Sequence, residues 1–386
     1  MALAAIALGV AAVVVAGGFI HDVYIQFGES IIHSQYGHLQ ISRNGYAAHG
    51  TQRPMDYLIE GGAGVINRVH GRAGIETVLS RLRFIGLANA GGGDLPIVGE
   101  GVEPKLENRL GTFVQLVDGR LLRADDRYAV VIGDGVAKAL HIGPGRQVSL
   151  SIVTREGALN SLEFDVVGIF RTYSKDFDQR AVRLPLQAAQ ELLATGGINE
   201  IVVGLSNTAA TFETAAVLRA ALPNAEYEIK TWRDLADFYG KTVQLFDRQF
   251  GFLQVVLLLM IILSVANTIN TAVFERLPEF GTMLALGDRR RDVFRLIMLE
   301  CMLLGLLGSA VGIAVGVAVA LAISAVGIPM PPPPNTDVGY TALVRIVPQV
   351  LIGAFVVGTV SAVLAGIVPS LKIARFPPVD ALRRAL

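Results

Sequence analysis

The sequence has very little cysteine, comparatively little charge and no surplus of either sign. Cys301 is the only cysteine in 386 residues, so no disulfide can form within the chain and each folded part must rely on its packed core. Charged residues make up 17% of the chain and hydrophobic residues 52%, whereas soluble domains carry about 25% charged residues. The 33 basic residues only balance the 33 acidic ones. We therefore expect a membrane protein with a soluble part and no nucleic-acid partner.

Two glycine motifs look like nucleotide sites but lack parts that binding requires. Gly133 and Gly135 follow the strand-like "YAVVI", yet the third glycine of a dinucleotide-binding turn is missing, so we expect a plain strand, turn and helix. The segment "YGKT", which begins at Tyr239, resembles the end of a phosphate loop, but Leu235 stands where that loop has its first glycine. No cofactor is therefore expected on this chain.

Four histidines crowd the start of the soluble part, at His21, His33, His38 and His49. They do not show the spacing with acidic or cysteine partners that metal ligands normally have, so we expect polar surface histidines and no metal site. No nucleophile, base and orienting group stand out as a pattern either, so we predict no catalytic residue and no enzyme activity on this chain.

Four windows are apolar enough over about 20 residues to cross a bilayer. They are 2–20, 250–274, a part of 293–328, and 346–371. The first could instead be a cleaved signal peptide, although it has no basic start and its apolar run is long.

Basic residues in the short loops predict the orientation. The loop 275–295 holds five arginines and the tail after residue 371 holds four basic residues, whereas 329–345 holds one. Because such residues favour the cytoplasmic side, the large domain should lie outside. We expect a multi-pass α-helical membrane protein with four transmembrane helices and a large mixed α+β extracytoplasmic domain between helices 1 and 2. The predicted parts are 1–20 (first span), 21–230 (outer domain), 231–249 (stalk helix), 250–274 (second span), 275–291 (coupling helix and loop), 292–328 (third span), 329–345 (proline-rich outer loop), 346–371 (fourth span) and 372–386 (tail).

The outer domain alternates strand-like and helix-like segments, such as "NEIVVGL" and "LPLQAAQELLATG". After it, Thr231 and Asp234 have the spacing of a capping box, and apolar residues then recur at helical spacing as far as Phe250. This pattern predicts one continuous helix from Thr231 into the second span. A helix of that kind could carry motion, or could be a purely structural support.

Two rows of residues, each on one face of a span, predict helix–helix contacts within the membrane. Polar side chains need hydrogen-bond partners in lipid, and small residues allow two helices to approach closely. The polar stripe of the second span consists of Ser264, Asn267, Thr268 and Thr271; the small-residue stripe of the third consists of Gly308, Gly312, Gly316, Ala320 and Ser324. The partner helix could belong to this chain or to another. Glu300 could be a proton or substrate site, but we favour an interfacial carboxylate that pairs with an arginine or caps a neighbouring helix.

Between the second and third spans, Leu277, Phe280 and Leu284 fall on one face of a short helix, and Gly287 suits its C-terminal end. Such a helix could lie on the membrane surface or dock into a groove of another protein. The stretch "ERLPEFGTMLALGDRRRDVFRLIMLECMLLGLLG" resembles the signature of the MacB/FtsX-like permeases of ABC transporters, and "PSLKIARFPPVDALR" resembles the family's closing motif. More loosely, "YGHLQISRNGYA" and "VVGIFRTYSKDFDQRAVRLPLQAAQELL" resemble the outer domain of the lipoprotein-releasing LolC/LolE branch.

The resemblance implies an ABC transporter permease subunit in the cell inner membrane, with its large domain in the periplasm. It implies that residues 275–287 form a coupling helix on a separate ABC ATPase, where ATP is bound and hydrolysed. The residues so implied are Glu275, Arg276, Glu279, Gly281, Leu284, Leu286 and Gly287. A second permease chain, membrane lipid and a periplasmic or outer-membrane protein are the further partners, and the substrate would be a lipoprotein, a lipid or another exported molecule.

A second function stays open at this point. FtsX-like relatives transmit a signal across the membrane to a cell-wall hydrolase without transporting anything. The run Pro329 to Pro334 is a departure from the family pattern; it predicts a stiff polyproline turn or a mere spacer.

Overall fold

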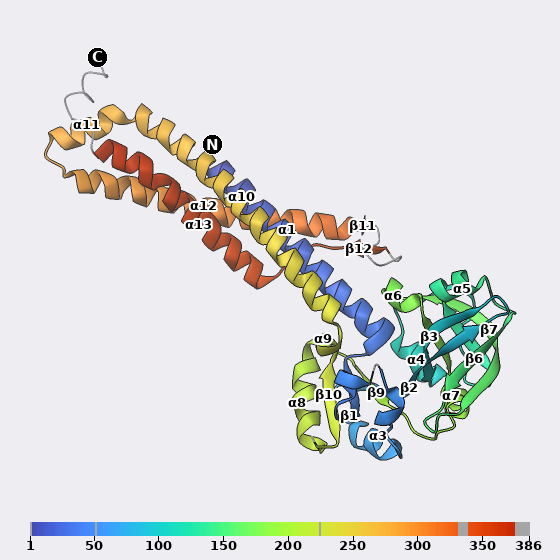
Figure 1. The fold of residues 1–386 in the computed structure, drawn as a ribbon. Coiled ribbons are helices and arrows are strands. Elements are labelled where there is room, and N and C mark those ends of the chain that lie inside the picture. Colours follow the sequence, from blue (N-terminus) through green and yellow to red (C-terminus); the bar gives the residue numbers. More distant parts are fainter. Residues whose placement is uncertain (1, 51, 224, 331–338, 375–386) are drawn as a thin grey trace. The chain divides into compact units, whose positions relative to one another are not determined.

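The structure, a computed structural model, describes residues 2–50, 52–223, 225–330 and 339–374. Within them, four helices are long and apolar enough to cross a membrane. They belong to α1 (Ala2–Ile31), α10 (Asp237–Glu275), α12 (Arg290–Val326) and α13 (Pro348–Ala374) (Figure 1). The predicted four-span architecture is confirmed. Most of the proline run and the tail beyond Ala374 lie outside the described residues.

The chain forms two compact units. The helical unit holds residues 2–25, 242–330 and 341–374, and the α/β unit is built mainly from residues 26–241. Helix α1 runs past the predicted end at residue 20 and is followed by a π-helical turn, η1 (Ile32–Tyr36). In the helical unit, α10 is followed by α11 (Leu277–Ala285) and α12, and two short strands, β11 (Ile328–Met330) and β12 (Tyr340–Ala342), pair between α12 and α13.

The small-residue stripe of α12 packs against α1 of the same chain. A Cβ atom added to Gly308 would lie 2.9 Å from Ile6, and one added to Gly312 would lie 2.7 Å from the backbone oxygen of Ala7. Gly316 meets Val14 in the same way. Glycine is required here because the two backbones approach more closely than any side chain allows. Ala320 is buried too, and Ser324 Oγ donates to Val344 O at 3.1 Å.

The polar stripe of α10 does not meet another helix of this chain. Its side chains Ser264, Asn267 and Thr271 are exposed, and Thr268 is half-buried. The hydroxyl group of Thr268 donates to Ser264 O at 2.9 Å, and that of Thr271 donates to Asn267 O at 3.1 Å, each one turn earlier in the same helix. The buried face of α10 consists instead of Ile261, Val265 and Ile269. Apolar packing therefore selects the face that turns inward, and a partner helix for the stripe is not found among the described helices of this chain, so that contact stays a prediction.

Asp22, near the end of the apolar part of α1, is buried and holds the segment before α13. Its carboxylate accepts a hydrogen bond from Leu343 N at 2.9 Å and pairs with Arg345 Nε at 2.7 Å. Its side chain is 0% exposed, and a buried charge of this kind needs such partners to be stable. Arg345 N in turn donates to Gly18 O at 3.2 Å. The start of the fourth span is thereby tied to the first span.

The α/β unit contains one ten-stranded mixed sheet, which confirms the predicted class of the outer domain. The strand order is β10-β1-β9-β2-β3-β8-β5-β7-β4, with β6 paired to β2 and β7. The strands are β1 (Leu39–Arg43), β2 (Ile75–Asn89), β3 (Asp94–Val102), β4 (Gln115–Gly119), β5 (Ala129–Gly133), β6 (Gln147–Val153), β7 (Leu159–Arg171), β8 (Ala181–Pro185), β9 (Glu200–Leu205) and β10 (Tyr227–Thr231).

The sheet belongs to two lobes that share the long strand β2 (Figure 1). The first lobe has β1, β9 and β10, with a core of aliphatic side chains that includes α3 and α8. The second has β3 to β8, with a core that includes α5 and α7. The short helices are α2 (Tyr46–His49), η2 (Pro54–Tyr57), α3 (Ala63–Val69), α4 (Pro104–Leu110), α5 (Asp134–Leu140), α6 (Lys175–Asp178), α7 (Leu186–Leu192), η3 (Thr208–Ala210), α8 (Thr211–Ala221) and α9 (Trp232–Leu235).

The predicted stalk helix is interrupted. The capping box of Thr231 and Asp234 is present, but α9 ends at Leu235 and Ala236 has non-helical angles (φ −94°, ψ 64°) before α10 begins. The rings of Trp232 and Tyr239 lie 4.8 Å apart, whereas residues seven apart in one helix are separated by about 10.5 Å along its axis. The break allows both rings to be buried together, which periodicity alone does not reveal.

Candidate functional site

Helix α11 lies at the turn between α10 and α12 (Figure 1) and has an inward and an outward side. Phe280 is 2% exposed and packs, with Met283 and Leu284, into the apolar core of the helical unit. On the outward side Glu279 is exposed, and Leu286, just past the helix, is 88% exposed. Gly281 is buried, and Glu275 is exposed at the end of α10. The side chain of Leu277 lies outside the described residues.

Arg276 links α11 to Glu300 of α12. Its Nε donates to Glu279 Oε2 at 3.0 Å, and its Nη1 donates to Glu300 Oε1 at 3.0 Å. The prediction that Glu300 pairs with an arginine is confirmed. All three side chains are 44% to 65% exposed, so each pair contributes little to stability. Their effect is to orient α11 relative to α12.

Gly287 ends α11 in a left-handed conformation. Its φ is +107°, a region that side-chain-bearing residues rarely adopt. Gly287 N donates to Leu284 O at 3.3 Å and Asp288 N donates to Met283 O at 3.1 Å, which is the hydrogen-bond pattern of a Schellman motif. This glycine therefore sets the angle at which the chain leaves α11 for α12.

In the α/β unit, five buried charged residues and one half-buried one, Arg83, form one network: Arg81, Arg83, Glu100, Glu107, Arg183 and Glu200. Three positive and three negative charges balance one another. Burial alone would raise the pKa of Glu100, but the charges of Arg81, Arg183 and Arg83 outweigh it and lower the pKa to about 2. The carboxylate therefore stays charged in the folded protein.

The network also holds the end of the first helix. Arg81 Nη1 donates to Gln35 O at 2.5 Å, and Arg183 Nη2 donates to Ser34 O at 2.9 Å. Carbonyl groups at the end of a helix have no partner within the helix, so two buried guanidinium groups satisfy those of η1. The helix that begins as α1 is thereby joined to β2 and β8.

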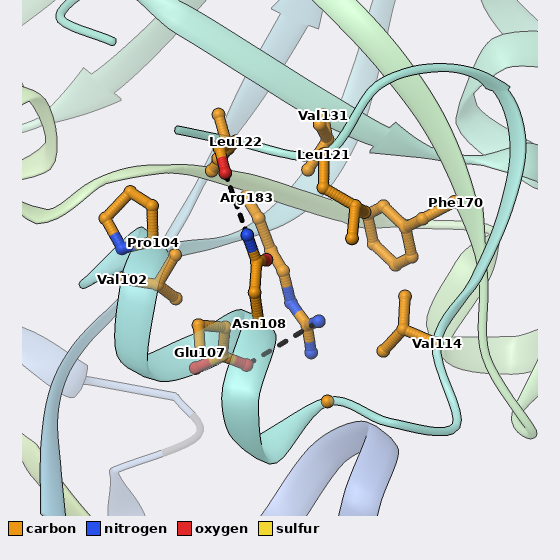
Figure 2. Close-up of a pocket in the computed structure, with 11 residues that line it drawn as sticks. Val102, Pro104, Glu107, Asn108, Val114, Leu121, Leu122, Val131, Phe170 and Arg183 are labelled. Atoms are coloured by element: carbon orange, nitrogen blue, oxygen red, sulfur yellow. Dashed lines mark hydrogen bonds and ion pairs between the residues drawn. The ribbon is translucent and has the colours of Figure 1, made fainter. Parts of the chain in front are cut away.

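Figure 2 shows Arg183 reaching Glu107, beside Asn108 and Phe170 in a small recess. Asn108 Nδ2 donates to Leu122 O at 2.9 Å across this recess. The open space is only about 20 Å³, which is room for one water molecule. The recess is therefore part of the packing around the network and too small for a ligand.

Glu29, His33 and His38 lie close enough to hold a metal ion, with their ligand atoms within 4.8 Å of one another. His38 is 1% exposed, so the expectation of a surface histidine was wrong for this residue: its backbone nitrogen bonds Val203 O at 3.0 Å and places it at the sheet. Leu205 N donates to His38 Nδ1 at 3.0 Å, so the neutral ring carries its proton on Nε2 and has no lone pair left for a metal.

This trio is a hydrogen-bonded support. Burial lowers the pKa of His38 to about 4, with the charge of His33 adding to the effect. His38 Nε2 lies 3.0 Å from Thr208 Oγ1, and His33 Nδ1 lies 3.0 Å from Leu110 O. His33 Nε2 also lies 3.3 Å from Glu29 Oε2. The i, i+4 spacing of these two residues is the sequence signal that could have predicted this contact.

Comparison with known proteins gives the same division of the chain. Residues 251–378 match the FtsX-like permease C-terminal family, and residues 1–221 match the MacB-like periplasmic core domain. An uncharacterized ABC transporter permease of Methanocaldococcus jannaschii is 24% identical over 272 residues, covering 69% of this chain and 65% of that protein. The macrolide export ATP-binding/permease protein MacB of Escherichia coli is 31% identical over 168 residues, covering 42% of this chain and 24% of MacB.

The periplasmic region of MacB from Actinobacillus actinomycetemcomitans aligns with 53% of this chain and 92% of its own, at 18% identity and a TM-score of 0.38. The chain thus spans just under two thirds of the first of these relatives and a quarter of the second. Both family matches fall where the sequence resemblance placed them, while the narrower likeness to the LolC/LolE branch stays a prediction. The chain belongs to the FtsX-like ABC transporter permeases that carry a MacB-like periplasmic core domain.

Proposed function

We propose that this permease transmits ATP-driven motion across the inner membrane. In this proposal α11 docks on a cytoplasmic ABC ATPase, and α1 and α10 carry the resulting movement to the α/β domain in the periplasm. The observation that carries the proposal is the division of α11 into a buried apolar side and an exposed side with Glu279 and Leu286. A rigid helix with a free outward face suits a groove on a partner protein.

The alternative of a helix lying on the membrane surface fits α11 less well. Such a helix turns its apolar side toward lipid, but the apolar residue Phe280 of α11 is 2% exposed and buried in the chain's own core. The outward side would have to enter the lipid instead, and it carries the charges of Arg276 and Glu279. Docking on another protein leaves both sides satisfied.

The buried charge network supports the idea that the α/β domain receives the movement. Arg81 and Arg183 bind the carbonyl groups of Gln35 and Ser34. A displacement of the first helix would therefore pull on β2 and β8 directly. Because Arg81 and Arg183 are buried with their carboxylate partners, a change in these contacts is costly, and the helix end and the sheet would move as one body.

A second permease chain, identical or related, would complete the membrane part. The polar stripe of α10 is exposed in this chain, with Ser264, Asn267 and Thr271 unburied. Polar side chains within a membrane favour contact with another helix. We assign this face to the second permease chain, with lipid around the pair.

The substrate would be an exported molecule. Two relatives are named for export, one of macrolides and one of pyoverdine, which supports an exported molecule; a lipoprotein or lipid is the narrower form of the same idea. The other function, signal transmission to a periplasmic hydrolase, would use the same helices. The genes that neighbour this one would distinguish the two, because a cell-wall hydrolase gene beside the ATPase gene favours signalling.

The test is the replacement of Leu286 by aspartate and of Glu279 by lysine. Leu286 is 88% exposed, so its replacement should leave the fold unchanged while weakening the contact with the ATPase. We expect less ATPase to copurify with the tagged permease from membranes, and less ATP hydrolysis by the complex. Gly287→Val is a less clean variant, because the positive φ of Gly287 makes any side chain there strained.

The matched control is Glu156→Lys, the same charge reversal on an exposed loop of the α/β domain. It should copurify with the ATPase like the unmodified chain. If the Leu286 and Glu279 variants insert normally and also behave like the control, α11 is not the docking element and the proposal is wrong.

A further inference from the structure

A large cavity opens between the two lobes of the α/β unit. Its volume is about 760 Å³, within the range of roughly 300–1,000 Å³ that small-molecule sites have. One wall is formed by β1 and β10 and the other by β3 and the α6 region, with η1 between them. A cavity lined by both lobes responds to any change in the angle between them.

The floor of the cavity presents an arginine with unused donors. Arg83 Nε and Nη2 each lie 3.0 Å from Glu100 Oε1, and Nη1 lies 3.3 Å from Glu200 Oε1. A guanidinium group has five N–H donors, so about two of them remain available. The side chain of Arg83 is 21% exposed, whereas Glu100 and Glu200 are at most 1% exposed. Of the six residues of the network, Arg83 and Glu200 line the cavity, and Arg83 is the more exposed of the two.

A second observation at the same place is an unsatisfied acceptor. Glu200 Oε1 accepts from Tyr46 Oη at 3.0 Å, but the buried Glu200 Oε2 has no hydrogen-bond partner in the described structure. Buried polar atoms without a partner are uncommon and costly. Glu200 and Tyr46 both line the cavity, so a ligand that brings a hydroxyl group or a bound water would supply the missing donor.

The charges around the cavity favour an anion. Lys230 and Arg180 line it and form no ion pair with any residue that the structure describes. The acidic lining residues are already engaged: Glu200 with Arg83, Asp234 in its capping box, and Asp237 with Lys241 at 3.9 Å. Asp176 also takes part in a polar interaction. The three basic residues of the lining do not outnumber the four acidic ones, but Lys230 and Arg180 are the two charged side chains there with no partner among the described residues.

The lining also includes apolar side chains. Ile85 is 49% exposed on β2, and Val98, Phe177 and Leu235 line the same cavity. Ligand sites usually combine such a surface with a few well-placed polar groups. The lining would hold an apolar body while the cationic groups hold a charged end.

We infer that this cavity binds an anionic amphiphile, a molecule with a carboxylate or phosphate group and an apolar body. The anionic group would be held by the free N–H donors of Arg83 and by Lys230, and Arg180 would stand at the rim. This site does not depend on the coupling proposed above, because binding requires neither the ATPase nor ATP.

The test uses the full chain in phosphatidylcholine nanodiscs, without ATPase, and isothermal titration calorimetry with three probes. They are hexyl phosphate, inorganic phosphate and hexyltrimethylammonium, and empty nanodiscs provide the blank. We expect saturable binding of one hexyl phosphate per chain, clearly weaker binding of inorganic phosphate, and none of the ammonium compound. Binding of the ammonium compound, or none of hexyl phosphate, would overturn the inference, and equal binding of both phosphates would disprove the amphiphile.

Variants then locate the site. Lys230→Ala should weaken hexyl phosphate binding about tenfold, the size of one charge-assisted contact, and Arg180→Ala at the rim about threefold, for a more exposed contact. Lys105→Ala removes an exposed positive charge of α4 that does not line the cavity, and it should leave the affinity unchanged. If all three variants bind alike, the ligand sits elsewhere and the assignment of this cavity is wrong.

Discussion

Replacing Glu100 with glutamine should destabilise the α/β domain by about 3 kcal/mol. Glu100 is fully buried and lies between Arg83 Nη2 at 3.0 Å and Arg183 Nε at 2.9 Å, with Arg81 Nη1 at 4.0 Å. A pKa lowered from 4.5 to about 2 corresponds to about 3 kcal/mol of folding free energy at neutral pH. Removing one partner of a buried ion pair costs a similar 3–5 kcal/mol or so, because one arginine charge is then left uncompensated.

The pH dependence follows from the sign of the shift. The folded pKa of Glu100 is lowered, so its contribution is fully present above pH 4.5 and is lost as the pH falls through about 2. Glu100→Gln has no group to titrate. Between pH 4.5 and 2, the free energy of unfolding of the variant should therefore fall less than that of the unmodified chain, because the contribution of Glu100 is already missing.

The assay is urea unfolding of the full chain in detergent, followed by tryptophan fluorescence. Trp232 is the only tryptophan, lies in the α/β unit and is 3% exposed, so its signal reports that unit. The control is Glu76→Gln, which breaks the exposed pair with Arg109 (3.1 Å, 48% and 60% exposed) and should change stability by less than about 1 kcal/mol. If Glu100→Gln loses no more than this control, or keeps the same acid profile as the unmodified chain, the reasoning about the network is refuted.

Two further changes test other parts of the fold. Gly312→Leu should destabilise the helical unit by about 1–3 kcal/mol, because even a Cβ atom would lie 2.7 Å from Ala7 O. The control is Gly353→Leu, whose site has open space around it. After heating, size-exclusion chromatography should show more aggregate for Gly312→Leu than for the control, and equal aggregation would contradict the packing. Burial raises the pKa of Asp178 to about 6, although hydrogen bonds from Thr172 act in the opposite direction and lower it. The contribution of Asp178 to folding stability is therefore fully present below pH 3.8 and is lost as the pH rises through about 6. Asp178→Asn should remove that decline, which urea unfolding at pH 4.5 and pH 7 measures; an unchanged difference between the two pH values would show that Asp178 does not titrate in this range.

The pairing of the membrane helices was only partly predictable. The spacing of Gly308, Gly312 and Gly316 predicts a close helix contact, and the structure identifies α1 of the same chain as the partner. The polar stripe of α10 gave the same kind of signal, yet it is exposed while Ile261 and Val265 are buried. Spacing shows which residues share a face, but which face turns inward depends on what the neighbouring helices offer.

The charged residues of the α/β domain were not predictable as a site. Arg81 and Arg183 are a hundred residues apart in the sequence, and nothing in their surroundings distinguishes them from surface arginines. The sheet order brings β2, β3, β8 and β9 side by side, and only then do the six charges meet. The cavity has the same origin, since its lining comes from strands and helices of both lobes.

The sequence by itself determined the four spans, the mixed α/β domain between the first two, and the short helix after the second span with its glycine end, because each depends on local composition and on periods of two to four residues. Tertiary structure alone decided the break at Ala236, the burial of His38, the charge network and the cavity. The physical reason is that long-range contacts depend on strand order and on which faces pack, and neither is encoded in the spacing of neighbouring residues.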